Sequence, residues 1–226
     1  MPKEAAGLSF TPLVIIGAAR SGTNILRDTL TRLPGFETWD CDEINAIWRY
    51  GNTDWPNDEI PVDRAHGRVK SYIRRQFRKR WRKSGEPAFV VEKTCANTLR
   101  VPFVDAILPE AKYILIVRNG YDVVASSRKR WKGELEIPSL PYFVAKAKYV
   151  PLSDIPLYGW RFLKERVRLL MGKQKRFSTW GPRFSGMESY DTQSLEMLCA
   201  RQWTASVKAG HDGLAHMQPP GSHGAI

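Results

Sequence analysis

The chain has 226 residues, which is enough for one α/β domain with a buried core. Apolar residues make up 42% of it and charged residues 26%, a composition that excludes a disordered tail. No apolar run approaches the roughly 18 to 20 residues that a membrane-spanning helix needs, and the first one is too short for a signal peptide. The net charge of +12 favours anionic partners, such as nucleotides, sulfated or phosphorylated sugars, nucleic acids or an anionic membrane surface.

The cysteines are odd in number and follow no metal-binding spacing; they are Cys41, Cys95 and Cys199. No C-x-x-C motif and no histidine cluster accompanies them. We therefore expect no metal site, and a reducing cytoplasm is the simplest compartment.

Three apolar runs are each followed by a polar loop and then by a helical pattern. The runs are Leu13–Ile16, Phe89–Val91 and Tyr113–Val117. Continuous apolar runs are typical of parallel strands that are buried on both faces. The sequence therefore predicts an α/β fold, a P-loop-like three-layer sandwich with a central parallel sheet flanked by helices.

The first of these helices is expected to begin near Thr23 and to end at Pro34-Gly35. Its apolar face should consist of Ile25, Leu26, Thr29, Leu30 and Leu33. A last helix is predicted over residues 194–208. Between the third strand region and this helix, residues 134–190 contain many prolines, aromatic residues and basic residues around one expected helix, 157–170. We interpret 134–190 as a lid or acceptor-binding insertion within a single domain that spans residues 1–226.

The strongest local signal lies between the first strand and its helix, where the sequence reads Gly17-Ala-Ala-Arg20-Ser21-Gly22-Thr23-Asn24. A glycine-bounded loop at a helix N-terminus directs backbone N–H groups and the positive end of the helix dipole at one spot, which binds phosphate-like anions. Gly17 and Gly22 match the glycines of a P-loop, but Thr23 and Asn24 replace the Lys and the Ser/Thr that a P-loop NTPase needs. The cation of this loop is Arg20. A tight turn without a ligand is the plain alternative.

This segment resembles the phosphosulfate loop, [K/R]-S-G-T, of the sulfotransferase family that uses 3'-phosphoadenosine 5'-phosphosulfate (PAPS), in its bacterial or carbohydrate-type branch. The resemblance implies that Arg20 contacts the oxygen between phosphate and sulfonate. It implies that the residues after Arg20 hold the 5'-phosphate; they are Ser21, Gly22, Thr23 and Asn24. Arg118 and Ser126 have the eight-residue spacing of the family's 3'-phosphate site. Each half alone is a moderate signal, and the two together in this order are specific.

An E-K-T motif with Lys93 at its centre follows the second apolar run, as E-K-[TS] does in many members of this branch. The resemblance places Lys93 near the sulfonate or the acceptor. Cys95 stands where the cytosolic small-molecule branch has its basic histidine, so a carboxylate is expected as the base. Bacterial members with a similar D-E-I-N-x-x-W-R-Y-G-N segment indicate Glu43. Asp40 and Asp42 are alternatives, and an ordinary solvated carboxylate is the plain interpretation.

The family mechanism is an in-line displacement at sulfur without a metal. Glu43 would accept the proton of an acceptor hydroxyl or amine, while Arg20 and Lys93 stabilise charge on the leaving phosphate. A carbohydrate or glycolipid is the acceptor class that we expect. Family members commonly continue past a helix like 194–208 into another strand, which the sequence does not show before Ile226. We therefore expect a C-terminus that is shortened relative to the family.

Nine Lys and Arg residues fall within residues 68–83, where apolar side chains form one helical stripe: Val69, Tyr72, Ile73, Phe77 and Trp81. The plain interpretation is an amphipathic helix with a solvated basic face. The functional one is a docking surface for an anionic, sugar-like acceptor or for lipid headgroups at a membrane surface. Two alternatives concern the whole chain. One is a nucleic-acid- or polyanion-binding protein, although no recognised module supports it. The other is a P-loop-like nucleotide kinase, against which the missing loop lysine argues.

Overall fold

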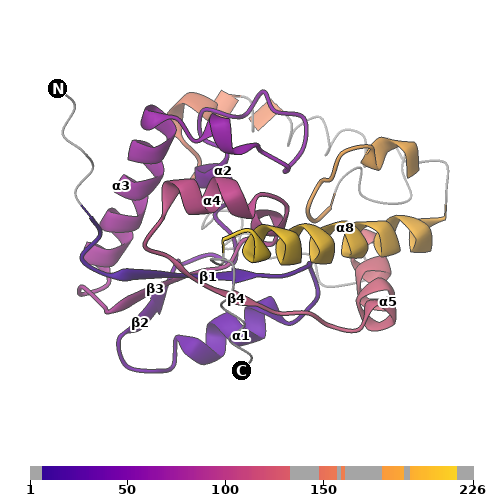
Figure 1. The fold of residues 1–226 in the computed structure, drawn as a ribbon, viewed down its shortest axis with the longest axis horizontal. Helices are drawn as coiled ribbons and strands as arrows, with labels where there is room; N and C mark the ends of the chain where they lie inside the picture. The colour runs from indigo at the N-terminus through magenta and orange to yellow at the C-terminus, as the bar shows by residue number, and fades with distance from the viewer. Residues whose placement is uncertain (1–6, 133–147, 157–158, 161–179, 191–193, 218–226) are drawn as a thin grey trace.

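A central sheet of four parallel strands organises the computed structural model (Figure 1). The strand order is β2-β3-β1-β4, so that β1 pairs with β3 on one side and with β4 on the other. Leu13 of β1, for example, aligns with Val91 of β3 and with Lys112 of β4. The strands are β1 (Thr11–Ile16), β2 (Phe36–Thr38), β3 (Phe89–Glu92) and β4 (Lys112–Leu115).

The structure describes residues 7–132, 148–156, 159–160, 180–190 and 194–217. Within them the α-helices are α1 (Thr23–Leu30), α2 (Asn45–Trp48), α3 (Gly67–Lys83), α4 (Val101–Ile107), α5 (Gly120–Trp131) and α8 (Leu195–Ala215). The 3-10 helices are η1 (Val62–Arg64), η2 (Cys95–Leu99), η3 (Leu152–Asp154) and η4 (Met187–Tyr190). None of the helices described combines the length and the apolar character needed to cross a membrane. Most of the predicted insertion lies outside the described residues, including all of the expected helix 157–170 except residues 159–160, and its role as a lid stays a prediction.

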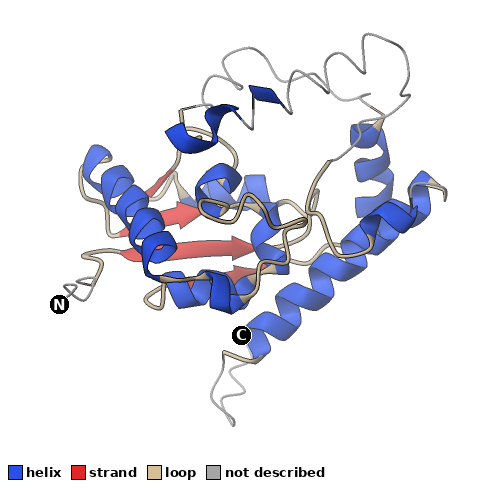
Figure 2. Cartoon of the chain, turned by 90° about the horizontal axis from the view of Figure 1, so that it is seen from above, coloured by secondary structure: helices blue, strands red, loops and turns tan. Residues whose placement is uncertain are grey.

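Helices cover both faces of the sheet, as the red strands between blue helices in Figure 2 show. Side chains alternate along β1, so that Val14 and Ile16 join the core formed with α3 and α4. Leu13 and Ile15 face the other way, toward the apolar side chains of α1. The predicted three-layer α/β fold is therefore confirmed, with four strands where three apolar runs had been recognised.

Helix α1 is shorter and less buried than its sequence pattern predicts. It ends at Leu30, so Leu33 lies beyond it, and Gly35 turns the chain back toward β2 with a φ of +80°. Leu26 and Leu30 pack against the sheet, whereas Ile25 is 74% exposed. Consecutive helical residues are about 100° apart, which turns Ile25 away from the sheet that Leu26 faces.

Helix α3 confirms the amphipathic helix predicted over 68–83, since Val69, Ile73 and Phe77 are completely buried. Helix α8 begins where predicted, with Ser194 as its N-cap, and continues past 208 to Ala215. It packs against α5 (Figure 1). Strand β2 and helix α2 were not predicted, because each is short and carries no extended apolar pattern. Helix α4 is the helix expected after the second apolar run.

Candidate functional site

The loop between β1 and α1 is tightly packed beneath its exposed surface. Gly17 leaves no room for a side chain, because an added Cβ would lie 2.8 Å from the backbone oxygen of Ile116. The Ser21 amide donates to the Ala18 carbonyl at 3.2 Å, which closes a turn, and Gly22 has a φ of +92°. Both glycines predicted to bound the loop are thus required by its geometry.

The surface of this loop is suited to an anion. No side chain caps the N-terminus of α1, and no acidic residue occupies its first turn, so the first amides of the helix remain available to a ligand. The Ser21 hydroxyl is buried and has no hydrogen-bond partner among the residues that the structure describes. Arg20 is exposed and adopts a φ of +69°, a strained conformation for a residue with a side chain. Strain of this kind concentrates at functional sites.

The second predicted element lies directly beside this loop. Arg20 Nε donates to Ser126 Oγ at 2.8 Å, although the two residues are 106 positions apart. The guanidinium of Arg118 lies 3.4 Å from the backbone oxygen of Arg20. Arg118 also forms an ion pair with Asp122 one turn into α5, at 3.4 Å. The structure therefore brings the three residues Arg20, Arg118 and Ser126 to one surface, at the carboxyl ends of β1 and β4.

Helix α8 supports this surface through Trp203, which sequence reasoning did not identify as a site residue. Its indole Nε1 donates to the Arg118 carbonyl at 3.2 Å. Its ring lies so close to Gly120 that an added Cβ would be 3.0 Å away. The glycine after Arg118-Asn119 was the signal that something large approaches the start of α5, but its partner is more than 80 residues away in the sequence.

Glu43 and Lys93 form an ion pair near the same loop. Lys93 Nζ lies 3.0 Å from Glu43 Oε1, and the backbone amide of Cys95 donates to the same oxygen at 3.3 Å. The Lys93 side chain is 2% exposed and that of Glu43 is 25% exposed. The carboxylate can therefore be reached from solvent while the ammonium group is enclosed, which suits an exchange of protons with a bound molecule.

Cys95 connects this pair to the anion loop. Its sulfur lies 3.8 Å from Thr23 Oγ1, in the first turn of α1. Burial, together with the neighbouring Glu43 carboxylate, raises the pKa of Cys95 to about 12, so the thiol stays protonated. Burial alone would lower the pKa of Lys93, but its interactions with Cys95 and with the Glu43 carboxylate raise it on balance. Lys93 is therefore a cation at neutral pH.

The alternative carboxylate Asp40 has other partners. It accepts hydrogen bonds from Arg80, from Lys83 at 3.2 Å and from the Tyr149 hydroxyl at 3.2 Å. Burial raises the pKa of Asp40, but these donors outweigh it and hold the pKa below its usual value. A carboxylate occupied by two cations is a poor proton acceptor, which leaves Glu43 as the better candidate. Among the residues described, no three His, Cys, Asp or Glu side chains gather as a metal site would require.

The predicted site residues thus occupy one region, although their roles stay predictions. The model of the sulfotransferase family matches residues 12–147, which is more than half of the chain. This span contains both the anion loop and the Arg118–Ser126 element, as well as Glu43 and Lys93. A search among curated proteins finds no match to the chain. On the strength of the family match, the chain belongs to the sulfotransferase family.

Proposed function

We propose that the protein transfers a sulfonate group from PAPS to a hydroxyl or amine of an acceptor. One observation carries the proposal: Arg20 of the anion loop contacts Ser126, and Thr23 of the same helix end contacts Cys95, beside Lys93 and Glu43. Segments that are far apart in the sequence thus bring anion donors close to one another and to a carboxylate. A donor of two phosphate groups and a sulfonate requires such an arrangement.

PAPS would be held by groups of two kinds. Backbone amides at the start of α1, with Ser21, Thr23 and Asn24, would bind the 5'-phosphate. Arg118 and Ser126 would bind the 3'-phosphate, the arginine through its planar fork of donors. The Arg20 side chain is hydrogen-bonded to Ser126 and has to rotate to reach the oxygen that bridges phosphate and sulfonate. Its exposed side chain leaves it free to do so.

The transfer itself forms one bond and breaks one bond at sulfur. The acceptor oxygen or nitrogen attacks the sulfur while the bond from sulfur to the bridging oxygen breaks, and 3'-phosphoadenosine 5'-phosphate (PAP) leaves. Glu43 takes the acceptor proton, because its carboxylate is partly exposed beside the loop. Arg20 and Lys93 stabilise the charge that develops on the leaving phosphate.

An anionic, sugar-like molecule is the acceptor class that the charge distribution favours. The exposed basic residues of α3 fall on one outer face; they are Arg68, Arg75, Lys79, Arg82 and Lys83. At its N-terminal end this face reaches the segment that follows Glu43, where Arg68 donates to the Tyr50 hydroxyl at 3.2 Å. The apolar side of α3 is buried in the core, so the helix cannot insert into a bilayer and would meet a membrane surface only through charge.

The face of α3 is less suited to nucleic acid. Base stacking needs free aromatic faces, and here Tyr50 and Tyr72 stack on one another at 3.7 Å. The guanidinium groups of Arg68 and Arg75 lie over the rings of Tyr50 and Tyr72, at 5.8 and 5.4 Å from the ring centroids. We therefore propose no specific nucleic-acid partner. A cytoplasmic location stays an inference from the unpatterned cysteines.

A thermal-shift experiment tests the donor site directly. PAP at about 100 times its dissociation constant adds roughly 2.7 kcal/mol of stability, which corresponds to a rise in Tm of about 5 to 10 °C for a domain of this size. ATP should give a much smaller rise. An equal response to ATP, dependent on magnesium, would instead support a nucleotide kinase. Salt-dependent binding of DNA without any response to PAP would refute the transferase.

Heparin retention tests the acceptor surface. Replacing Arg75 and Lys79 by serine should lower the slope of log affinity against log salt by about 1 for each charge removed. Replacing Arg32 and Lys112, exposed basic residues outside α3, provides the matched control. A control pair that lowers the slope as much as the α3 pair would show that heparin responds only to net charge.

A further inference from the structure

A buried hydrogen-bonded chain begins directly behind the Glu43–Lys93 pair. The Glu92 carboxylate is completely buried, and Thr94 Oγ1 donates to its Oε1 at 2.5 Å. The same hydroxyl accepts from the backbone amide of Ile44 at 3.1 Å. Because the single proton of the hydroxyl is given to Glu92, its lone pairs are directed at Ile44. Thr94 is thus held in one orientation.

The hydrogen bond between the Ile44 amide and the Thr94 hydroxyl is important because of where these two residues lie in the sequence. Ile44 follows Glu43, and Thr94 follows Lys93, so the bond joins the two chain segments one residue beyond the ion pair. It fixes the backbone of both segments independently of the charged side chains. A neutral hydroxyl that touches neither the Glu43 nor the Lys93 side chain therefore helps to set the distance between them.

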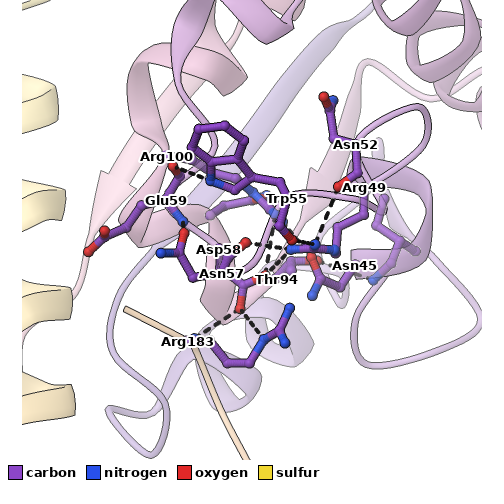
Figure 3. Close-up of polar contacts among 12 residues, drawn as sticks. Asn45, Arg49, Asn52, Trp55, Asn57, Asp58, Glu59, Thr94, Arg100 and Arg183 are labelled. Atoms are coloured by element: carbon purple, nitrogen blue, oxygen red, sulfur yellow. Dashed lines mark hydrogen bonds and ion pairs between the residues drawn. The ribbon is translucent and has the colours of Figure 1, made fainter. Parts of the chain in front are cut away.

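The other end of the hydrogen-bonded chain reaches Asp58, in a segment distant from Thr94 in the sequence. Glu92 Oε2 accepts from Asn97 Nδ2 at 2.8 Å, and Asn97 Oδ1 accepts from Arg100 Nε at 2.9 Å. Arg100 lies 3.7 Å from the carboxylate of Asp58. Asp58 also accepts from Arg49 at 3.1 Å, and Figure 3 shows it between Arg49 and Arg183.

Asp58 and Arg183 are joined by their backbones as well. The Asp58 amide donates to the Arg183 carbonyl at 2.8 Å, and the Asp58 carboxylate accepts from the Arg183 amide at 2.9 Å. Gln202 of α8 holds the same stretch from the other side, by donating to the carbonyls of Trp180 and Pro182, both at 2.8 Å. Residues 180–183 are therefore clamped between the chain of buried polar groups and the helix that supports Arg118.

We propose that Thr94 is a positioning residue for the Glu43–Lys93 pair, and that Asp58 anchors the far end of the chain that orients it. The inference rests on the proposed function, since it assumes that Glu43 and Lys93 act on the reacting groups. Burial raises the pKa of Glu92, but both of its oxygens accept hydrogen bonds, as the ionised form does. Networks of this kind restrict a site to one geometry, because any unpaired buried group is strongly unfavourable.

Two substitutions at Thr94 separate the hydroxyl from the rest of the side chain. Thr94→Val keeps the shape and removes both hydrogen bonds, whereas Thr94→Ser keeps the hydroxyl. A misplacement of about 1 Å in an active site lowers turnover by about 100-fold, so we expect kcat of Thr94→Val to fall by roughly 10- to 100-fold. Thr94→Ser should restore most of it. Turnover is measured as PAP release from PAPS with N-desulfated heparin, below the Tm of each variant.

The dissociation constant of PAP distinguishes positioning from simple loss of structure. Because the anion loop and Arg118 are not part of the hydrogen-bonded chain, PAP should bind Thr94→Val as it binds the wild type. A proportional loss of PAP binding and turnover would indicate unfolding and overturn the proposal. Equal kcat for Thr94→Val and Thr94→Ser would overturn it as well.

A double-mutant cycle tests the role of Asp58. Substitutions within one network are not additive, so Asp58→Asn combined with Thr94→Val should reduce kcat less than the product of the single effects. Asp58→Asn combined with Arg20→Ala should be multiplicative, and multiplicative behaviour of both pairs would remove Asp58 from the chain. The wild type and Glu43→Gln provide the separate tests. If the wild type releases no PAP above background, the proposed function fails. If Glu43→Gln turns over normally, Glu43 is not the base, and if Thr94→Val alone is normal, the positioning role fails alone.

Discussion

Replacing Arg20 by glycine separates the role of its side chain from the strain of its backbone. Arg20 has a φ of +69°, a conformation that costs a residue with a Cβ about 1 to 2 kcal/mol. Glycine in turn loses about 0.5 to 1 kcal/mol more chain entropy on folding. The hydrogen bond that is lost, to Ser126, is exposed. We therefore expect Arg20→Gly to leave the free energy of unfolding unchanged or to raise it by up to about 1 kcal/mol.

The same substitution should strongly impair the reaction. Removing one donor that stabilises developing charge lowers kcat by about 10² to 10³. Arg20→Ala is the matched control, because it removes the guanidinium but retains the backbone strain. It should lose the same activity and melt about 2 to 4 °C below Arg20→Gly for each kcal/mol of strain that glycine relieves. Urea denaturation and PAP release from PAPS measure the two effects separately.

Two results would refute this reasoning. If Arg20→Gly is less stable than Arg20→Ala, then the backbone at this position is not strained in the way that its φ indicates. If either variant turns over PAPS at a near-normal rate, then Arg20 does not stabilise the leaving group, whatever its effect on stability.

Two further predictions concern carboxylates. Glu43→Gln keeps an oxygen for Lys93 but cannot accept a proton, so kcat should fall by about 10² to 10⁴; an acidic limb that survives in the pH–rate profile would exclude Glu43 as the base. For Glu110, hydrogen bonds from Arg74 hold the pKa at about 2, although burial acts to raise it. Because the pKa of Glu110 is lowered in the folded state, the carboxylate stabilises the fold when the pH is above the ordinary carboxyl pKa. The stabilisation is lost as the pH falls toward 2. Glu110→Gln should therefore lower the free energy of unfolding by about 2 to 3 kcal/mol at pH 7. The difference in free energy of unfolding between the wild type and Glu110→Gln should become smaller below pH 4.5. Urea midpoints at pH 7 and pH 3 measure it, and a difference that is the same at both pH values would contradict the prediction.

Local patterns in the sequence were sufficient for the central strands and the anion loop. β1, β3 and β4 are recognisable because strands buried on both faces need uninterrupted apolar residues. The loop is recognisable because Gly17 and Gly22 meet conformational and packing demands that only glycine satisfies. Strand β2 carries no such pattern. It has only three residues, Phe36–Thr38, which join the sheet by pairing with β3.

Which distant residues meet depends on the way the whole chain folds. Glu43 and Lys93 are 50 positions apart, and Arg20 and Ser126 are 106 apart, so no local rule relates them. The motifs in the sequence already show that anion donors follow β1 and β4, and parallel strands bring such groups together because their carboxyl ends lie at one edge of the sheet. Which of Glu43 and Asp40 is the better proton acceptor depends on the cations that fold against each carboxylate. These contacts form by long-range packing, so the pattern of residues within one segment cannot predict them.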